Sequence, residues 1–221
     1  AELTASCAGL TASAQTLRGL YANTTDAVLL APVTCGSAQG LALLVVEGNY
    51  KDEASLIASA AVSLAFVDAF ETRLLAECDV SPMLRRTVLA AHQHVLALSQ
   101  ESVIPGSFGS SCGPRKTLNG IGASFAVAIV FAHRAWFTWV GECPIWLLRD
   151  DTARRLNVPH TLNHHLEYLA AVAREPSAAF PGAEFVVMRV LGIGTEIPRF
   201  DITRVDLRPS DRIVLSNGWL S

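Results

Sequence analysis

The first part of the chain places short apolar runs between polar turns, and this pattern predicts two neighbouring strands. Residues 27–31 and 41–46 are apolar runs bounded by Gly, Pro and Ser residues. Runs of this length and setting are typical of strands that are buried on both faces. We expect these two strands to pair with each other.

Two long helices are predicted after these strands. Apolar residues recur at spacings of three and four after Asp52, which can serve as an N-cap, and Ser81-Pro82 begins a second stretch of the same kind. We expect the two helices to lie side by side against a sheet. The positions expected to face the core are Leu56, Ala60, Leu64, Val67, Phe70 and Leu74 in the first helix, and Leu84, Val88, Ala91, Val95 and Leu98 in the second.

The second half of the chain is predicted to be mostly strands. Residues 101–120 are rich in Gly, Ser and Pro and lack periodicity, so we expect a mobile loop or a functional flap there. A third helix is expected near residues 163–174. Strands are expected at residues 122–132, 134–140 and 145–149, as an antiparallel meander with Gly141–Pro144 at one tip, and at 185–190, 201–207 and 212–215. This segregation of strands and helices favours an α+β fold with mostly antiparallel sheets.

Length and composition are those of a globular domain. The chain has 221 residues, 51% of them hydrophobic and 17% charged, and we expect a single domain over residues 1–221. No uncharged apolar run reaches the roughly 18–20 residues of a membrane span, so no membrane association is expected. A net charge of −3 without long Lys/Arg runs gives no electrostatic footprint for nucleic acid.

The cysteine pattern and the start of the chain set two further expectations. The five cysteines are odd in number and widely spaced, with no Cys-x-x-Cys pair, which favours neither a disulfide framework nor a zinc site. We therefore expect a reducing, cytoplasmic setting. The chain opens at Ala1 without a signal-peptide pattern, so we expect an excised region that is fused to further domains in a longer protein.

Several short motifs follow one another in a fixed order. Asp26 follows Asn23-Thr24-Thr25, Glu47-Gly48 ends an apolar run, Gly141-Glu142 follows a predicted strand, and Ser216-Asn217-Gly218 lies near the end. In this order the motifs resemble the PP2C (PPM) family of metal-dependent Ser/Thr protein phosphatases, over nearly the whole chain. The resemblance implies an antiparallel β-sandwich flanked on each side by helices, with a two-metal site at one end of the sandwich.

The resemblance also implies which residues form the site. Two divalent cations in such a site activate a water and neutralise phosphate charge, and Mg²⁺ or Mn²⁺ requires anionic oxygen ligands. Glutamates stand where the family has aspartates, and the added methylene misplaces an oxygen where only about 0.5 Å is tolerated. Asparagine supplies a neutral amide in place of a carboxylate. The matching positions are Asp26, Glu47, Gly48, Glu142 and Asn217; the expected ligands of a weakly bound Mn²⁺ or Mg²⁺, if either binds, are Asp26, Glu47 and Gly48.

Two further departures from the family pattern point the same way. The expected phosphate-binding arginine falls near Tyr21, with Arg18 as the nearest alternative, and tyrosine does not replace a bidentate guanidinium. The chain also ends at Ser221, before the family's terminal strand and its Asp-Asn motif. Both departures favour an eroded, pseudophosphatase-like member of the family.

Simpler interpretations remain open for most of these residues. Glu47 and Glu142 can be ordinary strand-end carboxylates, Asp26 can be a turn former, and Asn217-Gly218 is a common turn pair. The histidines around Glu167 (His160, His164 and His165) allow a metal interpretation but lack ligand spacing. Two hypotheses follow: a pseudophosphatase that regulates or binds a protein partner or a phosphoprotein, and an active, divergent Mn/Mg-dependent phosphatase.

Overall fold

The computed structural model describes residues 2–15, 25–49, 53–71, 74, 76, 79–100, 120–174 and 181–218. The predicted α+β class with antiparallel sheets is confirmed. The predicted loop over residues 101–120 lies outside the described residues except for Gly120.

The elements are β1 (Glu2–Cys7), β2 (Leu10–Gln15), β3 (Ala27–Cys35), β4 (Ala38–Gly48), α1 (Glu53–Glu71), α2 (Val80–Gln100), β5 (Ala123–Phe131), β6 (Arg134–Val140), β7 (Ile145–Arg149), β8 (Thr152–Arg155), α3 (Leu162–Ala173), the 3₁₀ helix η2 (Ala183–Phe185), β9 (Ile202–Asp206) and β10 (Arg212–Leu215).

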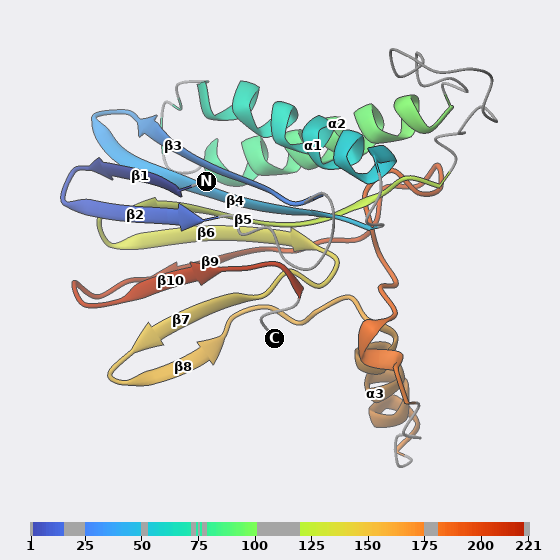
Figure 1. The fold of residues 1–221 in the computed structure, drawn as a ribbon. Coiled ribbons are helices and arrows are strands. Elements are labelled where there is room, and N and C mark those ends of the chain that lie inside the picture. Colours follow the sequence, from blue (N-terminus) through green and yellow to red (C-terminus); the bar gives the residue numbers. More distant parts are fainter. Residues whose placement is uncertain are drawn as a thin grey trace.

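Two antiparallel sheets form a sandwich (Figure 1). One has five strands in the order β3-β4-β5-β6-β9, and the other has three in the order β10-β7-β8. The predicted pairing of the first two strands is confirmed by the β3–β4 register, in which Ala27 faces Val46. A separate hairpin, β1–β2, packs against β3 and β4 and was not predicted, because its Ser, Thr and Ala residues give no apolar run.

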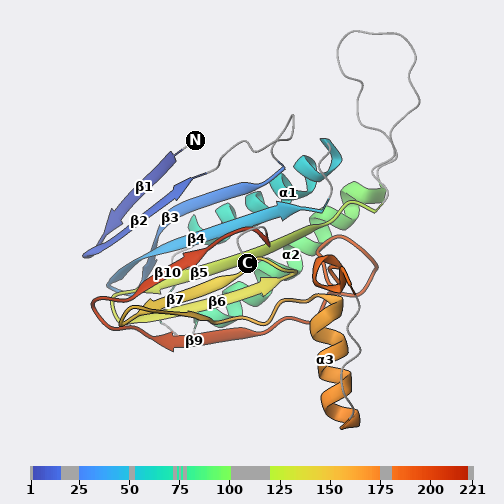
Figure 2. The ribbon, with the colours of Figure 1, turned by 60° about the horizontal axis from the view of Figure 1, so that its bottom comes forward.

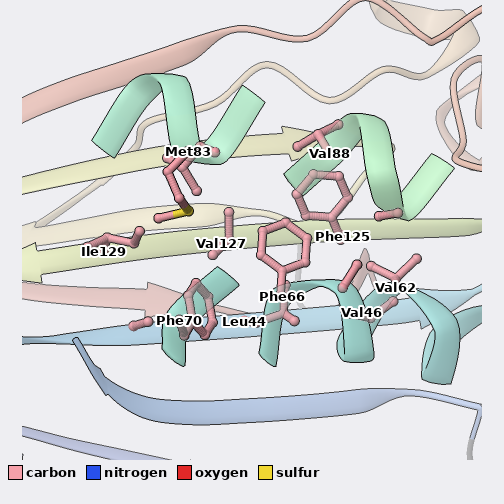
Figure 3. Close-up of a cluster of buried hydrophobic side chains, with 14 of the residues drawn as sticks. Leu44, Val46, Val62, Phe66, Phe70, Met83, Val88, Phe125, Val127 and Ile129 are labelled. Carbon is pink, nitrogen blue, oxygen red and sulfur yellow. The ribbon is translucent and has the colours of Figure 1, made fainter. Parts of the chain in front are cut away.

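The central strand β5 separates two hydrophobic cores because every one of its residues is buried. Alternate side chains of a strand point to opposite faces. Phe125 and Val127 belong to the core shared with α1 and α2 (Figure 3), whereas Ala126 and Ala128 belong to the core between the two sheets. Strands buried on both faces were predicted for residues 27–31 and 41–46. This is largely correct for residues 41–46 of β4, but residues 27–31 of the edge strand β3 are only partly buried.

Helices α1 and α2 lie side by side over one face of the five-stranded sheet, as predicted (Figure 1). The stripe predicted for α2 is largely correct, with Leu84, Val88, Ala91 and Val95 buried. The stripe predicted for α1 is wrong over most of the helix, where Leu56, Ala60 and Leu64 are exposed. It is correct at the end, where Phe70 is buried and Leu74, just beyond the helix, is also in the core. The buried residues of α1 are Ser55, Ala58, Ser59, Ala61, Val62, Ala65, Phe66 and Phe70.

Two predictions about the second half of the chain need correction. Strand β7 does not continue the β5–β6 meander; the chain crosses from the five-stranded to the three-stranded sheet between Val140 and Ile145. Residues 185–190 do not form a strand: Phe185 ends η2, and residues 186–190 follow it in irregular backbone. This segment forms only an isolated bridge, between Thr161 and Val187.

Helix α3 lies beyond one end of the sandwich (Figures 1 and 2). The resemblance implied helices on both sides of the sandwich, but α3 projects away from the three-stranded sheet and packs against η2. By length and composition alone, one helical segment in the described part of the chain, Ala54–Glu71, is apolar enough to cross a membrane. Half of that segment is buried inside the structure, where α1 packs on α2 and on the sheet.

Candidate functional site

Strand register brings the first candidate residues to one end of the five-stranded sheet. Ala27 faces Val46 in the β3–β4 pair, which places Asp26, just before β3, opposite Glu47 near the end of β4. In the β4–β5 pair Glu47 faces Ser124, and in the β5–β6 pair Phe125 faces Val140, so Ser124 in turn neighbours Gly141. Asp26, Glu47 and Gly141 therefore lie on one line across the sheet. Gly141 begins the connection between β6 and β7, which carries Glu142.

The segment after β10 completes the cluster from the other sheet. The side-chain amide Nδ2 of Asn217 donates a hydrogen bond to Oδ2 of Asp26, at 3.0 Å. The backbone N–H of Gly218 donates to Oε2 of Glu47, at 2.9 Å. Gly218 also lies against Glu142: a Cβ on Gly218 would stand 2.6 Å from Glu142 Cδ. The structure thus brings together the four predicted side chains of the site, Asp26, Glu47, Glu142 and Asn217.

All three carboxylates affect the pKa of a buried thiol, that of Cys143. Cys143 is fully buried, and burial raises the pKa of its thiol well above the usual value, with further increases from Glu47, Glu142 and Asp26 in that order. A thiol with a raised pKa stays protonated and is a poor nucleophile. Cys143 is therefore a structural residue that packs in the core between the sheets.

Gly48 has a steric role beside the cluster. A Cβ at Gly48 would stand 2.7 Å from both Cβ and the backbone oxygen of Ser55 in α1. Only glycine lets the end of β4 approach the first turn of α1 this closely. The expected role of the Gly48 carbonyl as a metal ligand stays a prediction.

Three residues that follow β7 along the chain, Arg155, Asn157 and His160, form hydrogen bonds with the connection between β6 and β7, which carries Glu142. Sequence reasoning missed these roles. The buried Asn157 donates to the carbonyl of Cys143 at 2.9 Å and accepts from the N–H of Ile145 at 2.8 Å. Arg155 donates to the carbonyl of Glu142 at 3.2 Å. Asn157 lies between Leu156 and Val158, two residues before Pro159, and this local sequence carries no signal for these contacts.

His160 is the third of these residues. Its ring stacks on Trp139, and its Nδ1 accepts the N–H of Gly141 at 3.2 Å. Burial, and after it the charge of Arg189, lowers the pKa of His160 to about 4. A neutral ring is needed because Nδ1 must accept a hydrogen bond. The three histidines do not form a joint site: His164 contacts Thr161 at 3.1 Å, and Glu167 accepts from Asn163 at 2.7 Å.

The donor set as arranged does not fit a pair of divalent cations. Three carboxylates provide the hard oxygen chemistry that Mg²⁺ and Mn²⁺ prefer. However, Asp26 and Glu47 each accept an N–H from the segment after β10, and an N–H group cannot ligate a cation. Within the described ranges, no group of three or more His, Cys, Asp or Glu side chains is arranged to hold a metal ion.

Other predicted features lie elsewhere. Arg18, Tyr21 and the predicted N-cap Asp52 are outside the described part of the chain. Two open hollows, of about 290 and 310 Å³, are lined by residues of 188–199 and by three strand turns, and none of the five candidate residues lines either.

Comparisons with known proteins concern the sequence and the fold of the chain. No protein-family model matches the chain. The serine/threonine phosphatase stp of Listeria innocua is 22% identical over 181 residues, which are 81% of this chain and 66% of that protein. The stp protein of Listeria monocytogenes matches with the same identity and coverage. The chain thus spans just under two thirds of the length of these curated relatives.

Solved structures show the same fold. The serine/threonine phosphatase of S. agalactiae superposes with a TM-score of 0.71 at 17% identity, over 97% of this chain and 76% of that one. The catalytic domain of the phosphatase PstP in complex with two manganese ions gives a TM-score of 0.61 at 20% identity, over 97% and 75%. The protein therefore has a PP2C-like α+β fold. With the sequence similarity along most of its length, the chain is homologous to the PPM Ser/Thr phosphatases.

Proposed function

We propose that this chain is a PP2C-fold pseudophosphatase, a regulatory or protein-binding module whose acidic cluster is closed by its own hydrogen bonds. The observation that carries the proposal is the pair of N–H donors, from Asn217 and Gly218, on the carboxylates of Asp26 and Glu47. These donors offer the partial positive charge that a cation would otherwise supply. The carboxylates then stabilise the fold instead of preparing the site for catalysis.

The contacts between the two sheets support this proposal. Glu47 lies on the five-stranded sheet and Gly218 follows the three-stranded sheet, so their hydrogen bond joins the two layers. Hydrogen bonds to a charged group contribute about 1.5–3 kcal/mol. A cation that displaced both donors would bind only if its own interactions with the carboxylates exceeded the loss of these two hydrogen bonds.

The partner that we propose is a phosphoprotein. The curated relatives are named serine/threonine phosphatases, and a domain of the same fold is suited to the same kind of protein surface. A reducing, cytoplasmic setting belongs to the proposal, supported by the free thiols of Cys7 and Cys143. Binding to phosphoserine and phosphothreonine peptide arrays, compared with unphosphorylated copies, tests the choice of partner.

A second candidate is an active, divergent phosphatase. The position of Asp26, Glu47 and Glu142 around Asn217 and Gly218 favours it, because neighbouring carboxylates attract divalent cations. In this case Asn217 and Gly218 would have to move away when a metal binds. The two candidates differ in whether these donors can be displaced.

Turnover of p-nitrophenyl phosphate with Mn²⁺ or Mg²⁺ separates the two candidates. The pseudophosphatase proposal predicts no turnover above that of the Asp26→Ala variant. Turnover that Asp26→Ala abolishes would establish the divergent enzyme instead. The triple variant Glu47→Asp, Glu142→Asp, Asn217→Asp tests the same point from the other side, because it restores the carboxylates that the family pattern requires.

A further inference from the structure

An open hollow of about 290 Å³ lies in the segment between η2 and β9. Eight residues between positions 188 and 199 line it, of which five are apolar and three are charged. The apolar Met188, Ile193 and Ile197 are between 41% and 49% exposed. Apolar side chains that line one concave surface indicate a binding site more strongly than scattered ones do. We call this feature the 188–199 hollow.

The chain on the first side of the hollow is anchored to two other parts of the fold. The backbone N–H of Met188 donates to the carbonyl of His160 at 2.7 Å. Leu191 exchanges two backbone hydrogen bonds with Ala123 at the start of β5, at 2.9 and 3.1 Å. These contacts fix the backbone at residues 188 and 191 before any partner binds.

Two further hydrogen bonds hold the hollow in shape. Gly192 has a φ of +86° and donates its N–H to Nδ1 of the buried His92 on α2, at 3.2 Å. Nη1 of Arg189 donates to the backbone carbonyl of Arg199 at 3.2 Å and so links the two ends of the lining segment. A preformed site loses less conformational entropy when it binds a partner.

The hollow lies at the same end of the five-stranded sheet as the acidic cluster. Ala123, which is bonded to Leu191, faces Gly48 in the β4–β5 register. The next pair in that register is Glu47 with Ser124. A partner that contacts this end of the sheet therefore meets both the hollow and the acidic cluster.

Charge decides which of the two can hold a phosphate group. The three carboxylates of the acidic cluster repel a phosphate in the absence of a cation. The hollow is lined by Arg189, Arg199 and Glu196, that is, by two positive charges and one negative charge. Neither arginine forms an ion pair with a described residue, whereas Arg149 and Arg208 are each paired with an aspartate. Guanidinium groups match the geometry of phosphate oxygens.

We infer that the 188–199 hollow binds a phosphorylated segment of a partner protein, with the phosphate on Arg189 and Arg199 and a neighbouring apolar side chain inside the hollow. The inference rests on the proposed function, because it names the place where the proposed phosphoprotein partner binds. Pockets for small molecules begin at about 300 Å³, so a hollow of about 290 Å³ suits one large side chain. The positive charge selects a phosphorylated segment over an unmodified one.

Fluorescence anisotropy with four labelled peptides, in the presence of a metal chelator, tests the inference. Each peptide has one phosphoserine in a Gly/Ser background, with a leucine one or two residues before or after it. The native chain is expected to bind the best of the four with a dissociation constant on the order of 100 μM, because one phosphate and one side chain supply few contacts. An unphosphorylated copy, and a copy with glycine in place of leucine, are each expected to bind about tenfold more weakly.

Two substitutions in the hollow and two matched controls locate the binding site. Arg199→Gln removes one guanidinium, and Ile197→Asp replaces an apolar contact by a negative charge. Each is expected to weaken binding about tenfold or more. The controls, Arg204→Gln on β9 and Val214→Asp on β10, change an exposed arginine and a side chain that is 41% exposed like Ile197, and neither residue lines the hollow. They are expected to leave the dissociation constant unchanged, and circular dichroism checks that every variant is folded.

Failure of this inference is distinguishable from failure of the proposed function. The inference is overturned if none of the four peptides binds up to millimolar concentration, or if the hollow variants and the controls bind alike. Peptide-array binding that the hollow variants leave intact would keep the phosphoprotein partner and reject only the hollow. Metal-dependent turnover would reject the pseudophosphatase, while peptide binding under chelation still decides the role of the hollow. Binding to phosphatidylserine vesicles that Arg199→Gln abolishes, without peptide binding, would assign the hollow to a membrane surface and overturn the inference.

Discussion

At the residue scale, the direction of two hydrogen bonds decides the character of the acidic cluster. Asn217 and Gly218 donate N–H groups to Asp26 and Glu47. An aspartate at position 217 would present oxygen atoms there and repel Asp26. A change of one side-chain atom from oxygen to nitrogen thus converts a repulsive contact, which needs a cation, into an attractive one.

Asn217→Asp is predicted to make the protein depend on divalent cations. Without metal the variant loses the hydrogen bond and gains a like-charge contact with Asp26, so its free energy of unfolding falls by about 1–3 kcal/mol. Added Mn²⁺ is expected to restore stability, because a ligand that binds only the folded state raises the melting temperature. Thermal denaturation with and without Mn²⁺ measures both effects.

Asn163→Asp provides the control for this substitution. Asn163 also donates its amide to a carboxylate, that of Glu167, but on the exposed surface of α3. It is expected to lose little stability and to show no response to Mn²⁺. An equal Mn²⁺ response in both variants would mean that the effect is one of surface charge and not of the acidic cluster.

His160 is predicted to make stability depend on pH. Its pKa is about 4 in the folded protein against an ordinary value of 6.5, so the unfolded chain binds the proton more readily. The free energy of unfolding that depends on neutral His160 is fully present above about pH 6.5 and is lost as pH falls toward 4. The shift corresponds to at most roughly 3 kcal/mol. Urea unfolding across this pH range measures the slope.

His160→Gln is expected to flatten this slope, since glutamine does not titrate. His94 on α2 is exposed, and His94→Gln is expected to leave the slope as it is. A slope that persists unchanged in His160→Gln would show that other groups govern acid stability between pH 4 and 6.5.

At the element scale, the crossing between β6 and β7 positions Glu142. Gly141 begins this crossing with a φ of +95°, and a Cβ there would stand 2.1 Å from Oγ of Ser124. Both the left-handed backbone and the contact with β5 require glycine. The contacts from Arg155, Asn157 and His160 then hold the crossing in place.

Gly141→Ala is predicted to destabilise the protein by about 2–4 kcal/mol, because strain at a positive φ adds to overpacking against Ser124. Gly182→Ala separates the two causes: Gly182 has a φ of +86°, but nothing lies within 4 Å of its missing Cβ. It is expected to cost only about 1 kcal/mol. Equal losses for the two variants, measured by chemical denaturation, would contradict the account of the crossing.

Sequence patterns predicted the buried face of a helix well where apolar and polar residues lie on different sides of it. The α2 stripe is correct because polar residues mark its outer side, whereas α1 is apolar on most sides and its small buried residues, such as Ala58 and Ser59, were not recognised as the core face. The segment 185–190 has the composition of a strand, but it pairs with Thr161 only at one bridge. Composition alone does not reveal whether a neighbouring strand is available.

At the scale of the whole molecule, the order of motifs predicted the sandwich and the convergence of its acidic residues. The four segments that carry Asp26, Glu47, Glu142 and Asn217 meet because antiparallel pairing aligns strand ends and β10 lies against β4 and β5. The hydrogen-bond partners within the cluster were not predictable. They depend on the positions of individual atoms across two sheets, about which residue spacing carries no information.

The central claim, that the N–H groups of Asn217 and Gly218 close the acidic cluster, is tested most directly by nuclear magnetic resonance with Mg²⁺, a diamagnetic cation. The account predicts that the Gly218 backbone amide and the Asn217 side-chain amide keep their chemical shifts and their slow hydrogen exchange up to millimolar Mg²⁺. Saturable shifts of both signals at micromolar Mg²⁺, with faster exchange at Gly218, would contradict it.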